Sequence, residues 1–273
     1  MNTTDILQEI VANKKLEVAQ QKQAVSKNDL LALGKDRLDR PIRSMRQALA
    51  SSPSGVIAEF KRRSPSKGWL HPNALVEDIV PAYEKNGAAA SSILTDSKFF
   101  GGSLGDLKIA NRLVNSLPLL RKDFIIDEYQ LYQSRVMGAD TVLLIAACLE
   151  IDQCRELSEL AHLLGLEVLL EVHSEKELNY LNDNVDILGV NNRHLGTFHT
   201  DVQNTFSLSE RMNASISTLD NPPLLISESG ISEPQTVVRL RQIGFRGFLI
   251  GETFMKTDNP GAALAQFIGG IVC

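Results

Sequence analysis

Short apolar runs alternate with segments of helical periodicity along residues 56–250. The runs are rich in Val, Ile and Leu, and this alternation is typical of βα units that build a parallel sheet. The predicted strands are Val56–Phe60, Ala89–Leu94, Pro118–Arg121, Thr141–Ala146, Glu167–Glu171, Ile187–Val190, Leu224–Ser227 and Phe248–Ile250. Eight parallel units close into an α/β fold of the (β/α)8 or TIM barrel type, which we expect here.

Helix ends support the same division of the chain. Glycine, which often ends a helix in a left-handed conformation, follows four of the helical segments, at Gly87, Gly138, Gly165 and Gly244. Pro81 falls inside the first of these segments, and it predicts either a kink or a helix that begins only near Asp78.

Residues 1–50 follow a different pattern and contain no aromatic residue. Ile6, Ile10 and Val18 recur at roughly helical spacing among Lys, Glu and Gln. We therefore expect an N-terminal helical extension over 1–50, within a single barrel domain of residues 1–273. Two arrangements are open, a cap at the bottom of the barrel or a lid near the ligand at the top. We favour a packed cap whose first turns reach the site.

Composition narrows the function classes. The chain has 273 residues, 43% of them hydrophobic, enough for one large core. Its net charge of −5 argues against a general nucleic-acid or membrane surface. The longest apolar run, near Val142–Leu149, is too short to span a membrane, and no signal-peptide layout is present. Three cysteines without metal spacing fit the reduced thiols of a cytoplasmic protein. We expect a monomer, with a weak dimer as the alternative.

The segment 56–68, Val-Ile-Ala-Glu-Phe-Lys-Arg-Arg-Ser-Pro-Ser-Lys-Gly, carries the first functional indication. Glu59 and Lys61 lie two apart at the end of a strand, so their side chains emerge on the same side. Pro65 stiffens the loop that follows and Gly68 ends it. The local cluster of basic residues favours a small anionic ligand. An edge strand with a solvated salt bridge is the alternative.

Other predicted strands also end in polar residues, and in barrels chemistry lies where strands end and βα loops begin. These residues are Thr95, Lys122, Glu171, Asn191, Asn192, Arg193, Glu228, Ser229, Gly251 and Glu252. Charged side chains that lie close together at the open end of a barrel, partly shielded from water, have shifted pKa values and suit acid–base catalysis. Charged side chains at the ends of several strands are more than solubility alone would require. They are two lysines and three glutamates: Lys61, Lys122, Glu59, Glu171 and Glu228.

Glycines follow the last two strands, in Ser229-Gly230 and at Gly251. Barrels often bind phosphate at these two strand ends, through bare backbone N–H groups and a short helix N-terminus. Each glycine alone could equally serve a tight turn. At consecutive strand ends, the two together favour phosphate.

Taken together, the motifs resemble those of the indole-3-glycerol-phosphate synthase family of tryptophan biosynthesis. The matching segments, in order along the chain, are residues 57–68, 93–96, 99–103, 120–125, 138–140, 143–145, 171–173, 189–193, 227–231 and 250–252. The resemblance implies ring closure of 1-(2-carboxyphenylamino)-1-deoxyribulose 5-phosphate to indole-3-glycerol phosphate, with loss of carbon dioxide and water.

The resemblance also implies residue roles. Lys122 would protonate the ribulose carbonyl, Lys61 would bind the anthranilate carboxylate and donate a proton during dehydration, and Glu171 would act as the general base. Orientation of the lysines and sugar hydroxyls would fall to Glu59, Asn191 and Glu228. Phosphate would be held by Ser229, Gly230, Gly251 and Glu252, with Arg193 and Ser64 nearby. The anthranilate ring would occupy a pocket of Pro65, Phe100, Phe124, Leu143 and Leu195.

The expected partner is a small phosphorylated substrate, and we expect no metal, cofactor, nucleic acid or membrane. Because the chain ends soon after the eighth predicted strand, we also expect no fused isomerase domain of the kind found in some relatives. Three alternatives share part of the pattern: a Schiff-base aldolase barrel, a flavin-binding barrel and a non-catalytic barrel that binds a phosphorylated ligand. Only the first would be trapped covalently by borohydride with its substrate, and only the second would be yellow.

Overall fold

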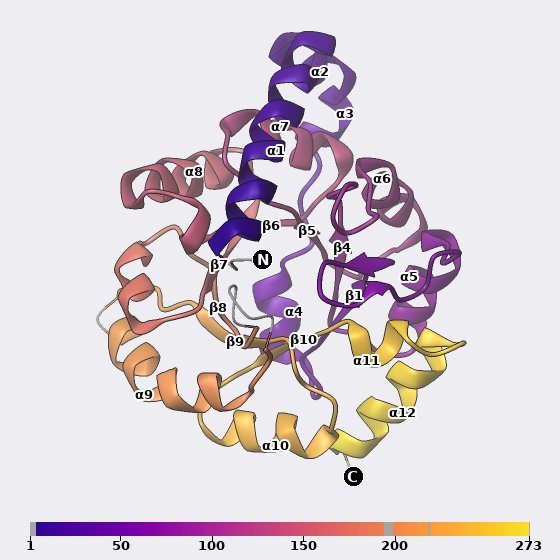
Figure 1. The fold of residues 1–273 in the computed structure, drawn as a ribbon, viewed down its shortest axis with the longest axis vertical. Helices are drawn as coiled ribbons and strands as arrows, with labels where there is room; N and C mark the ends of the chain where they lie inside the picture. The colour runs from indigo at the N-terminus through magenta and orange to yellow at the C-terminus, as the bar shows by residue number, and fades with distance from the viewer. Residues whose placement is uncertain (1–3, 194–198, 218, 273) are drawn as a thin grey trace.

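A closed barrel of parallel strands forms the centre of the computed structural model, which describes residues 4–193, 199–217 and 219–272 (Figure 1). In the described chain its eight strands follow one another around the barrel, and the last pairs with the first. The strands are β1 (Val56–Phe60), β4 (Ala90–Leu94), β5 (Leu119–Lys122), β6 (Thr141–Ile145), β7 (Glu167–Val172), β8 (Ile187–Asn191), β9 (Leu224–Glu228) and β10 (Gly247–Ile250). Every predicted strand is present, and the predicted barrel is confirmed.

Helices surround the barrel on its outer side (Figure 1). They are α5 (Val76–Lys85), α6 (Leu104–Leu113), α7 (Glu128–Met137), α8 (Ile151–Leu163), α9 (Gln203–Ile216), α10 (Pro234–Gln242), α11 (Glu252–Met255) and α12 (Pro260–Val272). Two 3-10 helices follow β6 and β7, η1 (Ala146–Cys148) and η2 (Glu175–Tyr180). The loop after β1 carries an antiparallel hairpin, β2 (Arg63–Ser64) and β3 (Gly68–Trp69), which the sequence pattern did not predict.

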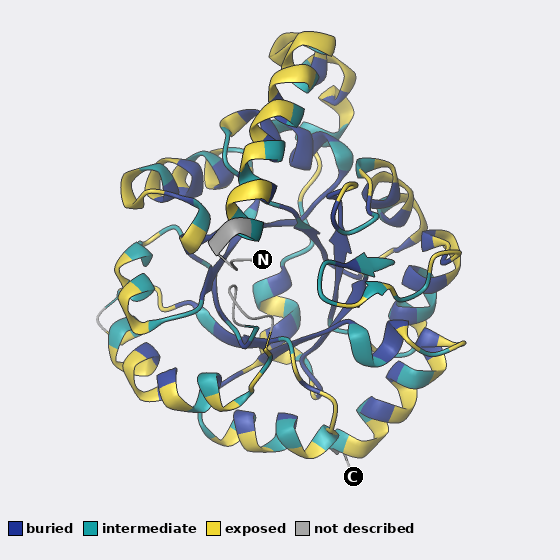
Figure 2. Cartoon of the chain, viewed as in Figure 1, coloured by how far each residue is buried: buried dark blue, intermediate teal, exposed yellow. Residues whose placement is uncertain are grey.

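The strands are buried on both faces, which explains their nearly continuous apolar runs (Figure 2). In β1, Val56, Ala58 and Phe60 join the core between sheet and helices, whereas Ile57 joins the core inside the barrel. The same alternation in the other strands places Leu120, Leu169 and Ile226 inside. Side chains two or four positions after these residues in the same strand therefore also face the barrel axis.

The N-terminal helices occupy both ends of the barrel. They are α1 (Thr4–Ala24), α2 (Lys27–Leu33), α3 (Lys35–Leu38) and α4 (Met45–Ser51). Met45 and Leu49 of α4 pack inside the barrel, and the backbone N–H of Arg46 donates to Glu167 at the start of β7. Helix α4 thus closes the bottom. Helix α1 runs to the opposite mouth, where the strands end (Figure 1).

Local signals for helix ends are mostly correct. The four glycines predicted to end helices all have positive φ, and at Gly138, with φ 93°, the N–H donates to the carbonyls of Ser134 and Arg135. Helix α5 begins at Val76 and contains Pro81, so the alternative start near Asp78 is wrong.

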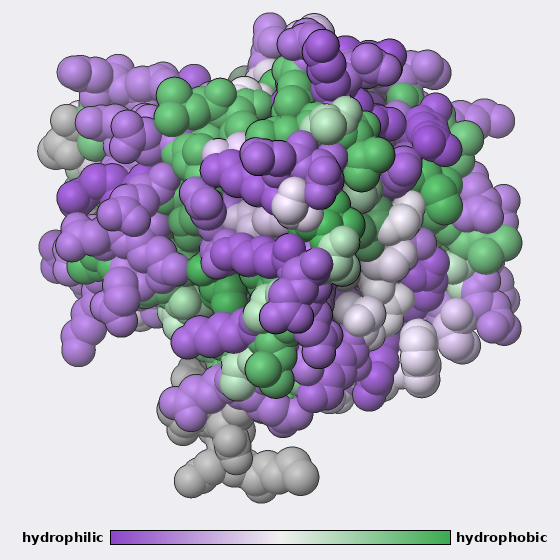
Figure 3. Space-filling view, turned by 90° about the horizontal axis from the view of Figure 1, so that it is seen from above, coloured by the Kyte–Doolittle hydropathy of each residue, from purple (hydrophilic) through white to green (hydrophobic). Residues whose placement is uncertain are grey.

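The face that carries α2 and α3 is largely hydrophilic, with scattered apolar patches (Figure 3). Large exposed apolar side chains include Leu16 of α1 and Leu33 of α2. Among the described helices, none is both long and apolar enough to cross a membrane.

Candidate active site

Strand parity directs the functional side chains toward the barrel axis. Ile57 faces inward in β1, so Glu59 and Lys61 extend from the same side of the strand at the mouth. Leu120 also faces inward, so Lys122, two residues later at the end of β5, faces the barrel axis as well. The inward residues at the ends of β1, β5, β7, β8 and β9 are Glu59, Lys61, Lys122, Glu171, Asn191 and Glu228.

Lys122 lies at the centre of this group. Its ammonium donates to Glu171 Oε2 over 2.9 Å and also to Glu228 Oε2. Both carboxylates are almost fully buried, and the Lys122 side chain is 13% exposed. One ammonium is therefore shared between two carboxylates in a region with little water.

This arrangement separates the pKa values of the two carboxylates. Burial alone would raise the pKa of Glu171, but the charge of Lys122, with that of His173, holds it well below its usual range. Burial raises the pKa of Glu228, and the Glu171 carboxylate adds to this effect. Burial opposes the charge on Lys122, yet the surrounding carboxylates outweigh burial and raise its pKa. Lys122 is therefore protonated at neutral pH and can donate a proton.

A second ion pair lies beside the first. Lys61 Nζ is 2.5 Å from Glu59 Oε1, and Glu59 is buried. Gly251 leaves room for this carboxylate, since a Cβ there would lie 2.3 Å from Glu59 Oε1. Gly189 does the same for Glu228, because a Cβ on Gly189 would lie 2.4 Å from Glu228 Oε1. These glycines therefore make space for two buried carboxylates of the candidate site.

An apolar cavity of about 130 Å³ adjoins the ion pairs. The rings of Phe100 and Phe124 lie 5.9 Å apart between centroids, and Pro65 and Leu143 also line the space. Helix α1 completes the lining with Ile6, Leu7 and Ile10. Apolar walls next to charged groups suit a ligand with an aromatic ring and polar substituents.

A wider, more polar cavity of about 390 Å³ lies toward β9 and β10. Its basic lining residues are Lys61, Lys67, Arg193 and Lys256, and its backbone lining includes Gly230 and Gly251. Arg193 lies at the boundary between the cavities and donates to Ser66 Oγ in the β2–β3 hairpin. Glu59, Lys61, Arg193, Ser229 and Leu249 line both cavities, so the two adjoin. The basic lining suits a phosphate joined to the group in the apolar cavity.

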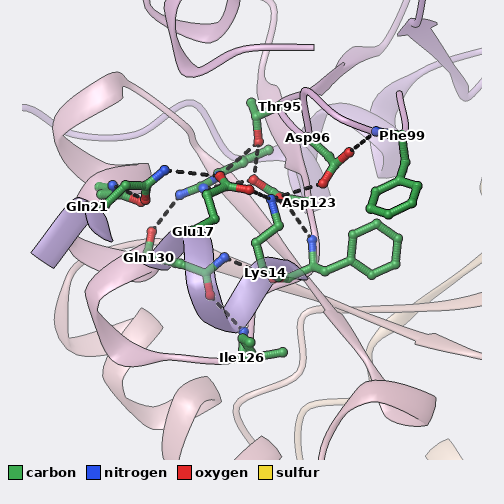
Figure 4. A network of polar contacts seen from close by, with 12 residues as sticks. Lys14, Glu17, Gln21, Thr95, Asp96, Phe99, Asp123, Ile126 and Gln130 are labelled. Atoms are coloured by element: carbon green, nitrogen blue, oxygen red, sulfur yellow. Dashed lines mark hydrogen bonds and ion pairs between the residues drawn. The ribbon is translucent and has the colours of Figure 1, made fainter. Parts of the chain in front are cut away.

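Behind these cavities, a buried polar network ties α1 to the strand ends (Figure 4). Lys14 of α1 has its Nζ 2.9 Å from Asp123 Oδ1 and 3.1 Å from Asp96 Oδ2. Asp123, which directly follows Lys122, also accepts from Thr95 Oγ1 over 2.6 Å and from Arg121 Nη2 over 2.8 Å. The strand end that presents Lys122 is thus fixed from several directions.

The structure brings the predicted site residues together in these cavities. Those that line the apolar cavity and the ion pairs are Glu59, Lys61, Ser64, Pro65, Phe100, Lys122, Phe124, Leu143, Glu171 and Asn191. Those that line the polar cavity are Arg193, Ser229, Gly230, Gly251 and Glu252. Ser64, expected near the phosphate, instead lines the apolar cavity. Glu228 contacts Lys122 from below, and Leu195 lies outside the described residues.

The first turns of the N-terminal helical segment were expected to reach the site, and Ile6, Leu7 and Ile10 of α1 do line the apolar cavity. The buried attachment of α1 through Lys14 was not predicted. The apolar spacing of α1 predicted a helix, but an amphipathic helix gives no sign of which surface it covers. Lys14 gave no signal either, since a lone lysine in a helix is usually exposed. Within the described ranges, no three His, Cys, Asp or Glu side chains are grouped to hold a metal ion.

Comparison with known proteins agrees with this geometry. Residues 7–267 match the family model for indole-3-glycerol phosphate synthase. The chain is 58% identical over 267 residues to the indole-3-glycerol phosphate synthase of Bacteroides thetaiotaomicron, covering 98% of this chain and 99% of that protein. The chain belongs to the indole-3-glycerol phosphate synthase family. The enzyme of the same name from Polaromonas naphthalenivorans is 44% identical over 272 residues, covering 97% and 99%.

Membership of the indole-3-glycerol phosphate synthase family confirms the predicted activity, a decarboxylating ring closure in tryptophan biosynthesis. It also sets aside the aldolase, flavin-binding and non-catalytic alternatives. Among solved structures, a mutant tryptophan synthase alpha-subunit from Pyrococcus furiosus superposes with a TM-score of 0.59 at 14% identity, covering 80% of this chain and 97% of that one. At that identity the likeness shows the barrel fold alone.

Proposed function

We propose that this chain closes the indole ring by general acid–base catalysis with its own lysines and glutamates. The supporting observation is the Lys122 ammonium, held between Glu171 and Glu228 at the junction of an apolar and a basic cavity. The anthranilate ring occupies the apolar cavity against Phe100 and Phe124, and the phosphate lies against Arg193 and the glycines after β9 and β10. The ribulose carbonyl then falls between the two cavities, next to Lys122.

In the first step, the ring carbon that bears the carboxylate attacks the ribulose carbonyl carbon. A carbon–carbon bond forms, and Lys122 donates a proton to the carbonyl oxygen. The carboxylate, held near Lys61, leaves as carbon dioxide and returns its bonding electrons to the ring. In the second step, Lys61 protonates the new hydroxyl, which leaves as water. Glu171 removes the proton from the neighbouring carbon, which completes the indole.

The remaining inward residues orient these groups. Glu59 holds Lys61 through the 2.5 Å ion pair, and Glu228 holds Lys122. Asn191 lines the apolar cavity beside Glu171 and orients the sugar hydroxyls. Cys154 is buried and Cys148 is partly buried, both as free thiols, which supports the proposal that the protein works in the reducing cytoplasm.

The reaction itself is the test. Purified protein and 1-(2-carboxyphenylamino)-1-deoxyribulose 5-phosphate should produce indole fluorescence and carbon dioxide in the presence of EDTA, without nucleotide or flavin. The loss of carbon dioxide makes the reaction effectively irreversible, so the signal should run to full consumption of substrate. Activity that disappears with the chelator and returns with a divalent metal would contradict the assignment of every proton transfer to Lys and Glu.

A further inference from the structure

Lys14 is a buried cation on α1, the helix that reaches the strand ends. Its side chain is 1% exposed, and its Nζ contacts Asp96, Asp123 and Glu17 at 2.8–3.1 Å (Figure 4). Lysine is almost never fully buried unless it is paired. Burial would lower the pKa of Lys14, but the charges of Asp123 and Asp96 outweigh burial and raise it. The ammonium is therefore a permanent charge in this cluster.

The strand ends are also held by contacts that do not involve Lys14. Asp123 Oδ2 accepts from Arg121 and Thr95, and Asp96 Oδ1 accepts from the backbone N–H of Phe99 over 2.8 Å. The other oxygen of Asp96, Oδ2, is buried and makes no hydrogen bond among the described residues, and it forms an ion pair with the ammonium of Lys14 at 3.1 Å. Without the ammonium this buried oxygen would be left unpaired, and a movement of α1 that admits water would relieve the cost.

The contacts of α1 divide along its length. Its second half is joined to α7 and the turn before it, through Lys22 with Asp127 and through Gln21, whose backbone carbonyl accepts from Tyr129 Oη. Its first half, which carries Ile6, Leu7 and Ile10 into the apolar cavity, is held by Lys14 and by exposed contacts of Lys98 with Asn13 and Glu9. Lys14 is thus a buried polar attachment of the half that lines the cavity, one turn after the buried Ile10.

We propose that Lys14 is a positioning residue that holds the first turns of α1 against the ends of β4 and β5, and that α1 thereby forms a wall of the aromatic-ring subsite. This inference rests on the proposed function, in which the apolar cavity receives the ring of the substrate. Lys14 does not touch the substrate. It acts through Ile6, Leu7 and Ile10, so it governs affinity for the ring and leaves the phosphate subsite unaffected.

The test compares Lys14→Met with Lys22→Met, a control on the same helix whose ion pair with Asp127 is exposed. Steady-state kinetics give kcat and KM for the full substrate. Competitive inhibition by anthranilate probes the ring subsite, and inhibition by inorganic phosphate probes the polar cavity.

Lys14→Met should raise KM and the anthranilate inhibition constant about tenfold or more, since buried apolar contact with the ring is lost. Its kcat and its phosphate inhibition constant should change less than about threefold, because the machinery around Lys122 and Arg193 is untouched. Lys22→Met should match the wild type.

A general loosening of the fold would lower the melting temperature and weaken both inhibitors together, and that result would overturn the inference. So would an unchanged anthranilate inhibition constant, or a wild type that anthranilate does not inhibit competitively. Should Lys14→Met fail to fold, Asp96→Asn removes the charge of one of the two strand-end carboxylates that contact Lys14, and it must weaken binding of anthranilate alone, by a smaller factor. Equal binding of anthranilate by that variant and the wild type would again overturn it. A wild type that forms no indole product would instead refute the proposed function.

Discussion

The ammonium of Lys122 lies 2.9 Å from a carboxylate oxygen of Glu171, so the proposed acid and base are paired before substrate arrives. In this state Glu171 is a weak base, because the neighbouring charge holds its pKa low. In the proposed mechanism the ammonium turns toward the ribulose carbonyl, which would release that carboxylate. We therefore propose that proton donation by Lys122 in the first step prepares Glu171 to act as the base in the second.

Removal of either partner should lower kcat steeply. We expect Lys122→Ala and Glu171→Gln to lose about 10²–10⁴-fold, the usual contribution of a positioned acid or base. Circular dichroism should show an unchanged fold, and Lys108→Ala, an exposed position on α6, should keep wild-type kcat. Retention of more than about half the rate in either variant would contradict its assigned role.

The pH dependence should report the charge beside Glu171. His173 Nε2 lies 3.5 Å from Glu171 Oε1, and Lys122 and Glu228 complete the charged surroundings of this carboxylate. Burial would lower the pKa of His173, but Glu177 and Glu171 outweigh burial and raise it, so the imidazole is charged on the acid side. Its charge lowers the pKa of Glu171. His173→Gln removes that effect, and the acid limb of kcat/KM should move to higher pH by about one unit.

His162→Gln provides the control for this shift, since His162 pairs with Asp186 on the outer side of the barrel. Its acid limb should match that of the wild type. An acid limb that stays in place or moves to lower pH in His173→Gln would mean that His173 does not influence the base.

Phosphate affinity should depend on Arg193. Loss of its charge in Arg193→Gln should raise KM and the inhibition constant of inorganic phosphate roughly tenfold or more, because a hydrogen bond to a charged group contributes about 1.5–3 kcal/mol. Arg63→Gln is the matched control, as Arg63 donates to the carbonyl of Lys98 and lines neither cavity. If Arg193→Gln lowered kcat and left phosphate inhibition intact, Arg193 would act on the reacting centre instead.

Strand-end chemistry was accessible from the sequence because it follows from local rules. Alternation along a strand fixes which side chains face the axis, so the inward direction of Lys122 and Glu171 follows once the barrel is predicted. Loops after the strands then bring Arg193 and Gly251 to the same mouth. Each of these inferences needs only the position where a strand ends and the knowledge of which alternate residues face inward.

The contacts of α1 and the role of Gly251 were not accessible in this way. The pairing of Lys14 with Asp96 joins segments far apart in the sequence, and no local pattern marks it. Gly251 was expected to leave space for phosphate, yet its missing Cβ also makes room for Glu59. Substitution of Gly251 by Val would therefore disturb Glu59 as well as phosphate, which makes Arg193 the cleaner test of that subsite.

Gly189 should be required for both activity and stability. A Cβ at this position would lie 2.4 Å from Glu228 Oε1 and 3.1 Å from Ile226 Cγ1, and both of these side chains are buried. Gly189→Ala should therefore push Glu228 away from Lys122. We expect kcat to fall about tenfold or more, and the free energy of unfolding in urea to fall by about 1–3 kcal/mol, as for other overpacked cores.

Gly269→Ala separates this steric effect from the general consequence of adding a methyl group. Gly269 lies in α12 with nothing within 4 Å of its would-be Cβ, so alanine there should keep full activity and slightly raise stability. The double variant Gly189→Ala/Glu228→Gln should have the same kcat as Glu228→Gln alone, because both changes remove the same contact with Lys122. Additive losses in that cycle would show that Gly189 acts through a partner other than Glu228.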